Sequence, residues 1–152
     1  MAVLRDTPYG AFNFLVELND GTDAATAVGG FTDVSGLGTE ITLMDYRHGN
    51  DKENRVRKIP GLHKSADVTL KRGVMGTTNF WQWLAETRRN PKTQRNVLIT
   101  LNDEQGNPVM RWKLINARPM KWTGPNLAGK GGSEVAMEEL VVSSEGFEFS
   151  EV

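Results

Sequence analysis

Residues 95–119, "RNVLITLNDEQGNPVMRWKLINARP", decide the fold class, because they encode two strands joined by a tight turn. Apolar and polar residues alternate on both sides of the central "NDEQGNP", which is the period of a strand with one buried face. Asn, Asp, Gly and Pro in that centre suit the geometry of a hairpin turn. The stretch therefore predicts an antiparallel hairpin whose buried face consists of Val97, Ile99, Leu101, Met110, Trp112 and Leu114.

Further strands are predicted by the same alternation elsewhere in the chain. It occurs in residues 11–18 ("AFNFLVEL"), 40–46 ("EITLMDY") and 66–72 ("ADVTLKR"). Residues 134–140 ("EVAMEEL") fit either a helix or a strand, since their intrinsic preference is helical but their apolar positions also suit a strand. The chain is therefore expected to be mostly β.

Residues 77–91, "TTNFWQWLAETRRNP", are predicted to form the one helix. Thr77 or Thr78 suits the N-cap, and the pair Asn90-Pro91 ends the helix. Several strands, one helix and no alternation of strands with helices predict a mainly β, α+β domain. Its architecture would be a small barrel or sandwich of two packed antiparallel sheets with one flanking helix. The helix face expected to dock on a sheet is Phe80, Trp81 and Leu84.

The 152 residues are expected to fold as one domain, residues 1–152, because this length can bury a substantial core. The chain has no cysteine, which excludes disulfides and thiol chemistry and fits folding in a reducing cytoplasm. No signal peptide is evident at the N-terminus. No apolar run approaches the roughly 20 residues that cross a bilayer, so no membrane insertion is expected.

The formal net charge of −1 conceals an uneven distribution along the chain. All 18 Lys and Arg residues lie in residues 1–130, whereas residues 131–152 carry six glutamates and no basic residue. A basic body could bind nucleic acid with the acidic end as a mask, or the two regions could be complementary faces that meet between copies. A solvated surface without a partner is the third interpretation.

Residues 124–133, "GPNLAGKGGS", resemble a phosphate-binding loop but depart from its pattern. Gly131 stands where that loop needs a Ser or Thr hydroxyl for Mg²⁺, and Pro125 removes a backbone N–H that would contact phosphate. His48 and His63 lack the further ligands of a metal site. We therefore predict no catalytic, cofactor-binding or metal-binding residues, and no enzyme.

Residues 45–61, "DYRHGNDKENRVRKIPG", form a long polar segment of mixed charge. A loop of this length inside a compact domain is usually functional or disordered. Uniformly basic charge would suit nucleic acid, whereas interleaved charges of both signs suit contact with another protein surface. A solvated hairpin tip without a partner is the alternative.

Motifs in a fixed order resemble the tail tube proteins of contractile phage tails and related contractile injection systems, including the type VI secretion inner-tube protein. Each motif is weak alone, but the ordered set runs collinearly over about residues 8–147. His48 departs from the family pattern, because relatives carry an acidic residue there. The motifs are "FNFLVEL" (12–18), "VSGL" (34–37), "DYRHGND" (45–51), "KIPGLHK" (58–64), "VTLKRGVMG" (68–76), "FWQWL" (80–84), residues 95–119, "KWTGPNL" (121–127) and "EVAMEEL" (134–140).

The resemblance implies a small two-sheet barrel with one flanking helix and a long extended hairpin loop. Six copies would form a ring, and stacked rings would form an inner tube with a lumen for protein cargo or DNA. A contractile sheath and baseplate or tube-initiator proteins would be its partners. Such a subunit would be made in the bacterial cytoplasm and assembled into a phage tail or a released or cell-bound injection particle.

The resemblance also assigns residues 45–61 to contacts between neighbouring subunits and rings. A tube-initiator or baseplate paralogue of the same fold is one alternative. A small β-barrel module that binds an oligonucleotide or saccharide is another, and it would need exposed aromatic residues above a basic groove. The expected sheath-facing residues are Arg88, Arg89 and Lys92. The expected interface residues are Tyr46, Arg47, Asp51, Lys52, Glu53, Arg55 and Lys58.

Overall fold

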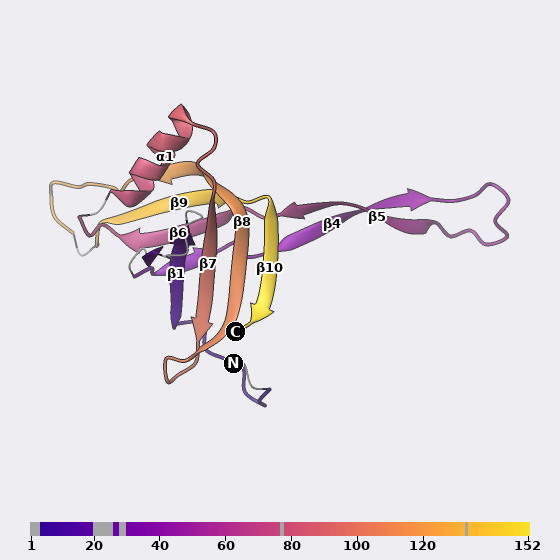
Figure 1. Ribbon diagram of the computed structural model, residues 1–152, viewed down its shortest axis with the longest axis horizontal. Coiled ribbons are helices and arrows are strands. Elements are labelled where there is room, and N and C mark those ends of the chain that lie inside the picture. The colour runs from indigo at the N-terminus through magenta and orange to yellow at the C-terminus, as the bar shows by residue number, and fades with distance from the viewer. Residues whose placement is uncertain (1–3, 20–25, 28–29, 77, 133) are drawn as a thin grey trace.

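Ten strands and one helix follow one another in a computed structural model of the chain, which describes residues 4–19, 26–27, 30–76, 78–132 and 134–152 (Figure 1). The predicted hairpin of residues 95–119 is present as two paired strands, and the second of them is 16 residues long. The elements are β1 (Phe14–Asn19), β2 (Thr26–Ala27), β3 (Asp33–Ser35), β4 (Thr39–Tyr46), β5 (Arg57–Ser65), β6 (Val68–Gly73), α1 (Asn79–Arg89), β7 (Arg95–Asn102), β8 (Pro108–Thr123), β9 (Met137–Ser143) and β10 (Gly146–Glu151).

The frame of the fold is a long antiparallel ribbon made of β8 and the chain that returns beside it. Around the bend of β8, strands β9 and β10 share one register, since Arg118 lies opposite Ser143 and Ile115 lies opposite Gly146; the pairing with β9 then shifts by one residue between Pro119 and Lys121. The ribbon bends near Asn116, whose backbone has a left-handed conformation with φ of 52° that Asn tolerates better than most residues. The first part of β8 therefore belongs to one sheet and the last part to another.

Glu145 clamps this bend from the returning chain. Its carboxylate accepts hydrogen bonds from Asn116 Nδ2 (3.0 Å) and Arg118 Nη1 (3.1 Å). These hydrogen bonds hold the pKa of Glu145 below its ordinary value of 4.5. Because the folded-state pKa is the lower one, the clamp stabilises the fold fully above the ordinary pKa and loses this contribution as the pH falls below it.

Two antiparallel sheets pack around one core. The first has the order β2-β1-β7-β8-β10 and the second the order β8-β9-β6-β3. Among the described residues no strand pairing joins β2 to β3, so the barrel is open there. The predicted architecture of two sheets and one helix is confirmed. The core side chains from the sheets are Val16, Leu18, Val68, Leu70, Val97, Ile99, Leu114, Ala117, Leu140 and Val142.

Helix α1 contributes two large aromatic side chains to this core. Phe80 and Trp83 are fully buried, and Trp83 Nε1 donates a hydrogen bond to the carbonyl of Thr93 at 2.9 Å. The buried face is therefore spaced i, i+3, and the predicted face of Phe80, Trp81 and Leu84 was wrong at Trp81, which is 43% exposed. Thr78 stands at the N-cap without a side-chain cap hydrogen bond, and Thr77 lies outside the described residues.

Residues 137–140 of the segment that fitted either helix or strand form the start of β9, and a buried ion pair explains why. Arg72 Nε donates to Glu138 Oε1 at 2.5 Å, and both side chains are at most 6% exposed. Trp122 Nε1 donates to the other oxygen of Glu138 at 3.2 Å. The Arg72 guanidinium also lies 3.9 Å from the ring centroid of Phe80. Partners on β6 and β8 thus hold Glu138 on a strand, against its intrinsic preference for a helix.

Replacing Glu138 by Ala is expected to lower the free energy of unfolding by about 3–5 kcal/mol, because the Arg72 charge is left buried without its carboxylate. Urea denaturation monitored by tryptophan fluorescence measures the change. The double variant Arg72→Met/Glu138→Leu should recover most of the loss, since it removes both buried charges. Glu53→Ala is the control: its partner Arg55 is 83% exposed, and the cost should stay below about 1 kcal/mol. A cost at Glu138 as small as at Glu53 would contradict this assignment.

A second ribbon begins in the body and leaves it. Asp33 on β3 lies opposite Lys71 on β6, and six positions farther along both strands Thr39 on β4 lies opposite Ser65 on β5. The β4–β5 pair therefore continues the β3–β6 pair in the same register. Gly36 permits the continuation, because its φ is 87° and a Cβ there would lie 2.2 Å from the carbonyl oxygen of Asp67.

Replacing Gly36 by Ala is expected to destabilise the chain by more than the roughly 1–2 kcal/mol that a left-handed alanine costs, because the clash with the Asp67 carbonyl adds to it. Equilibrium unfolding of the purified variant measures the loss. Gly129→Ala is the matched control, since a Cβ at Gly129 meets no atom within 4 Å. Equal stability of the two variants would show that the ribbon does not depend on this junction.

Candidate subunit interface

The β4–β5 hairpin projects far from the two-sheet body as a free arm (Figure 1). Its two strands pair with each other and, among the described residues, with no other strand. An isolated two-stranded hairpin is at best marginally stable in water. Its continuity with β3 and β6 anchors one end of the arm, but no strand among the described residues pairs with the rest of it.

Apolar side chains lie on both faces of the arm. Leu43 pairs with Pro60 and Met44 with Ile59, and paired residues share a face while successive residues point to opposite faces. Each face therefore carries an apolar pair that is exposed in the free chain. Leu62 lies where the register shifts between the pairs at Ile41 and Leu43, and it is 85% exposed. Strands with apolar side chains on both faces are typical of sheets that are covered on both sides.

The arm also presents two open backbone edges. The outer edge of β4 continues the free edge of β3, so unpaired N–H and C=O groups run from Asp33 to Tyr46 in the described structure. Proteins usually shorten, charge or cover such edges because they invite pairing with another chain. A long open edge with apolar neighbours marks a surface for association.

The tip of the arm, residues 47–56, is a loop that folds on itself. Arg47 donates hydrogen bonds to the carbonyls of Asp51 (3.1 Å) and Glu53 (3.4 Å). The Asp51 carboxylate accepts the backbone N–H of His48 at 3.2 Å, and the Tyr46 hydroxyl lies 3.1 Å from His48 Nδ1. Three of the predicted interface residues, Tyr46, Arg47 and Asp51, thus hold the shape of the tip.

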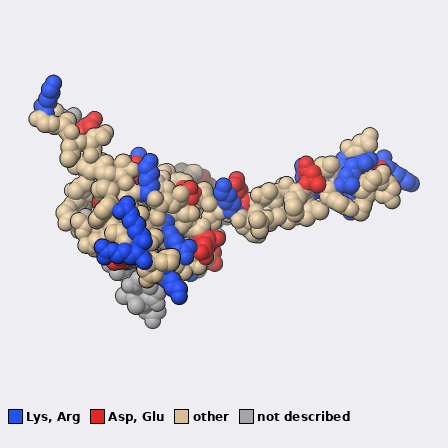
Figure 2. Space-filling view, turned by 90° about the horizontal axis from the view of Figure 1, so that it is seen from above, with Lys and Arg blue, Asp and Glu red and all other residues tan. Residues whose placement is uncertain are grey.

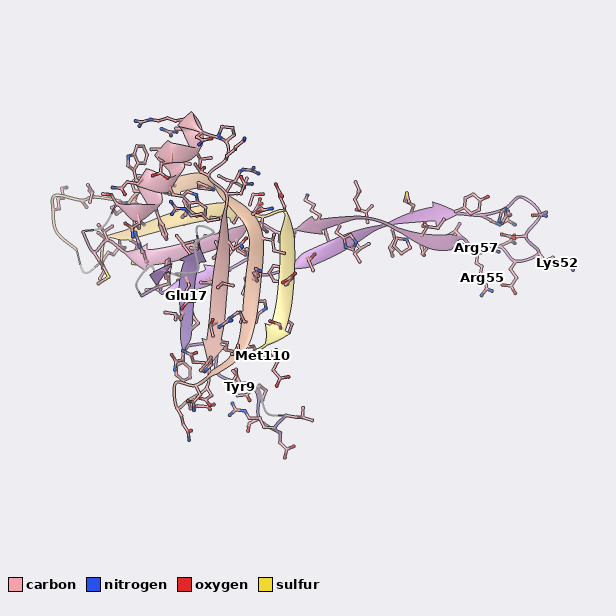
Figure 3. The ribbon with its side chains drawn as sticks, in the orientation of Figure 1. Tyr9, Glu17, Lys52, Arg55, Arg57 and Met110 are labelled. Carbon is pink, nitrogen blue, oxygen red and sulfur yellow. The ribbon has the colours of Figure 1, made fainter. Side chains whose placement is uncertain are left out.

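The other predicted interface residues carry charge along the arm. Lys58 pairs with Asp45 across the strands, and Arg55 pairs with Glu53 at 2.7 Å. Lys52 makes no ion pair or hydrogen bond with any described residue and extends from the tip with Arg55 and Arg57 (Figure 3). The tip together with Arg57, the first residue of β5, contains four basic and two acidic side chains, so residues 47–57 have a formal charge of +2.

The structure thus brings the predicted interface residues together on one arm, but the predicted long loop of residues 45–61 is shorter than expected. Residues 45–46 and 57–61 belong to the strands β4 and β5. The interface residues predicted from the sequence also did not include the exposed apolar side chains of the arm. Their signal was present in "EITLMDY", where apolar side chains occur at successive positions and hence on both faces: Ile41, Leu43 and Met44.

A second charged surface lies on the side of the body that carries α1. Arg88 and Arg89 are exposed in the last turn of the helix, and Lys92 follows it closely. The Arg88 guanidinium lies 5.3 Å from the ring centroid of the half-exposed Trp81, which packs edge-on against Trp122. Figure 2, which views the molecule from above, shows Lys and Arg gathered over the body and again at the tip of the arm.

The described part of the segment 124–133, residues 124–132, does not have the architecture of a phosphate-binding loop, and Ser133 lies outside the described residues. No helix is described between β8 and β9, so no helix N-terminus is available to a phosphate there. Among the described residues no three His, Asp or Glu side chains gather as a metal site would require. The only helix described, α1, is 11 residues long and too short to cross a bilayer.

An exposed apolar arm, open strand edges and separate charged surfaces are typical of a subunit that assembles with others. The family model of the T4-like virus tail tube protein gp19 matches residues 10–148. The chain therefore belongs to this tail tube family, and the resemblance drawn from its motifs is confirmed. No curated protein sequence matches the chain at a significant level.

Solved structures share the fold over nearly the whole chain. A chain of the extended PVC sheath–tube complex, an extracellular contractile injection system, is 25% identical with a TM-score of 0.81, covering 97% of this chain and 94% of that one. A chain of the anti-feeding prophage baseplate is 24% identical with a TM-score of 0.80, covering 96% and 97%. Hcp1 from Flavobacterium johnsoniae is 12% identical with a TM-score of 0.53, covering 91% and 98%.

Replacing Leu43 by Ser is expected to raise the protein concentration needed for self-association more than about tenfold, because burying a Leu side chain contributes about 1.5–3 kcal/mol. The stability of the isolated chain should change by less than about 0.5 kcal/mol, since Leu43 is 54% exposed there. Sedimentation velocity at several concentrations measures association. Leu43→Met, which conserves volume and polarity, is the control. Unchanged association in Leu43→Ser would exclude this face of the arm from the contact.

Proposed function

We propose that this chain is the repeating subunit of the inner tube of a contractile injection machine or contractile phage tail. Copies form six-membered rings that stack into a tube around a lumen. The observation that carries the proposal is the β4–β5 arm, which has apolar side chains on both faces and no partner strand among the described residues. Membership of the tail tube family supports the same function.

In this proposal the arm bridges neighbouring copies, within a ring or between rings. Its apolar faces supply the buried area, and its charged residues set register and orientation. Arg47, Asp51 and Tyr46 act by shaping the tip, whereas Lys52, Glu53, Arg55 and Lys58 act by direct contact. Heterologous contacts of this kind close into rings or continue as filaments.

The remaining partners follow from the same assembly. The basic surface at the end of α1, with Arg88, Arg89 and Lys92, faces the contractile sheath in this proposal. The tube lumen carries protein cargo or DNA, and the particle that contains the tube is a phage tail or an injection particle. The PVC neighbour comes from a sheath–tube complex, which supports a sheath as partner.

A tube-initiator or baseplate paralogue is the second candidate, because the fold matches a chain of the anti-feeding prophage baseplate as well as it matches a PVC sheath–tube chain. Such a protein would occupy one layer and need a template to assemble. Electron microscopy of the purified chain separates the two functions: stacked rings with a central channel support the tube subunit, and persistent monomers or single rings support the initiator. Binding of an oligonucleotide or saccharide by a persistent monomer would instead indicate a small-barrel binding module.

Reversing Lys52 and Arg55 to Glu is expected to abolish tube formation while the chain stays folded, because both side chains are exposed and their charges orient the contact. Negative-stain electron microscopy measures the tubes and circular dichroism the fold. The matched control reverses two cations on the helix surface, Arg89 and Lys92, and should leave tubes intact. Long tubes from Lys52→Glu/Arg55→Glu would remove the tip from the interface.

A further inference from the structure

The end of the body opposite the arm carries a groove of about 410 Å³ between the start of β9, the end of β6, the start of β3 and the loop after β8. In Figure 1 this loop and the arm extend in opposite directions along the longest axis of the molecule. A stack of copies that all point the same way brings one end of each copy to the other end of the next. In a stack along this longest axis, the groove of one copy faces the tip of another.

Charge in the groove is opposite to charge at the tip. Its lining includes four carboxylates and one cation, Lys71. Glu138 is buried and paired with Arg72, whereas Lys71 lies 3.9 Å from Glu139 and remains half-exposed. The carboxylates that can face a partner are Asp33, Glu134 and Glu139. Residues 47–57, the tip together with Arg57, have the opposite formal charge of +2. Their hollow of about 470 Å³ is lined by the cations Lys52, Arg55 and Arg57 and by the carboxylates Asp51 and Glu53.

Apolar residues accompany the charges on both surfaces. Val135 lines the groove and is 75% exposed, and Leu127 in the same loop is 85% exposed. Val56 lines the hollow at the tip and is 46% exposed. An apolar centre with charges around it is the usual composition of a protein interface. Lys130, in the same loop, is not among the residues that line the groove.

We propose that the groove is the receptor for the tip of the β4–β5 arm of a second copy of this chain. Lys52, Arg55 and Arg57 of one copy face Asp33, Glu134 and Glu139 of the next, and Val56 packs against Val135. The proposal rests on the proposed tube function, because it names the surface on which the arm docks. It makes the contact head-to-tail, so that each copy both offers a tip and receives one.

Charge reversal at both ends tests the docking. Glu134→Lys/Glu139→Lys should raise the concentration for tube formation at least tenfold, as should the tip reversal Lys52→Glu/Arg55→Glu, so that neither variant forms tubes at the concentration at which the wild-type chain does. The chain that carries all four changes should regain tubes, because opposite charges face each other again. The docking would be overturned if the groove-reversed chain assembled like wild type, or if the fourfold variant assembled no better than the tip reversal. In either case, tubes of the wild-type chain would still support the tube function.

Cysteine cross-linking gives a second test that does not depend on charge, and the chain contains no cysteine that could interfere. In Val56→Cys/Val135→Cys, mild oxidation of assembled tubes should give a ladder of disulfide-linked chains on a non-reducing gel. The control Leu62→Cys/Val135→Cys moves the first cysteine to the middle of the arm and should give no ladder. Tubes of the first variant that stay monomeric on the gel, or an equal ladder from the control, would overturn the docking. A wild-type chain that forms no tubes at all would instead refute the tube function.

Discussion

The shared register of two strand pairs is the constraint on which the shape of this molecule depends. Strands β3 and β6 are paired inside the second sheet, and β4 and β5 continue that pairing beyond the body. The arm is therefore not an appended loop but the outer half of a ribbon whose inner half is fixed by β9. Only a residue without a Cβ fits at Gly36, where the chain passes the Asp67 carbonyl. The position of the arm therefore depends on the packing of β3 and β6 in the body at its base.

The strands and the helix were predicted correctly where the apolar residues followed a single clear periodicity. Alternation fixed the strands of residues 95–119, and the terminating Asn90-Pro91 located the end of α1. The local sequence pattern gave wrong or open predictions where contacts with residues distant in the sequence decide the conformation. Glu138 lies on a strand because Arg72 and Trp122 bind its carboxylate, and Trp83 replaces Trp81 in the core because the helix packs at a particular rotation. Sequence placed the candidate interface residues on one segment, but it gave no sign that residues 33 and 134 lie at one groove.

Polar groups in this chain serve two different purposes. Glu138 and Arg72 are sealed inside the body, and Glu145 fastens the bend of β8, so these charges maintain the fold. The charges of the tip and of the helix surface are largely exposed, and the polar bonds at the tip are mostly within the tip itself. This division explains why charge reversal at the surface can change association while the fold persists.

The ribbon also determines how force would pass through the molecule. Ladder hydrogen bonds between antiparallel strands lie perpendicular to the strands. Tension applied at the tip is carried along the backbones of both β4 and β5 to the body, where it loads the bonds between β6 and β9 together in shear, instead of opening them one by one. The same pull continues through β6 to β9 and so reaches the second sheet over its whole width. A subunit built in this way would pass a pull on its arm into the body, with the strain shared among strands and not concentrated in a hinge.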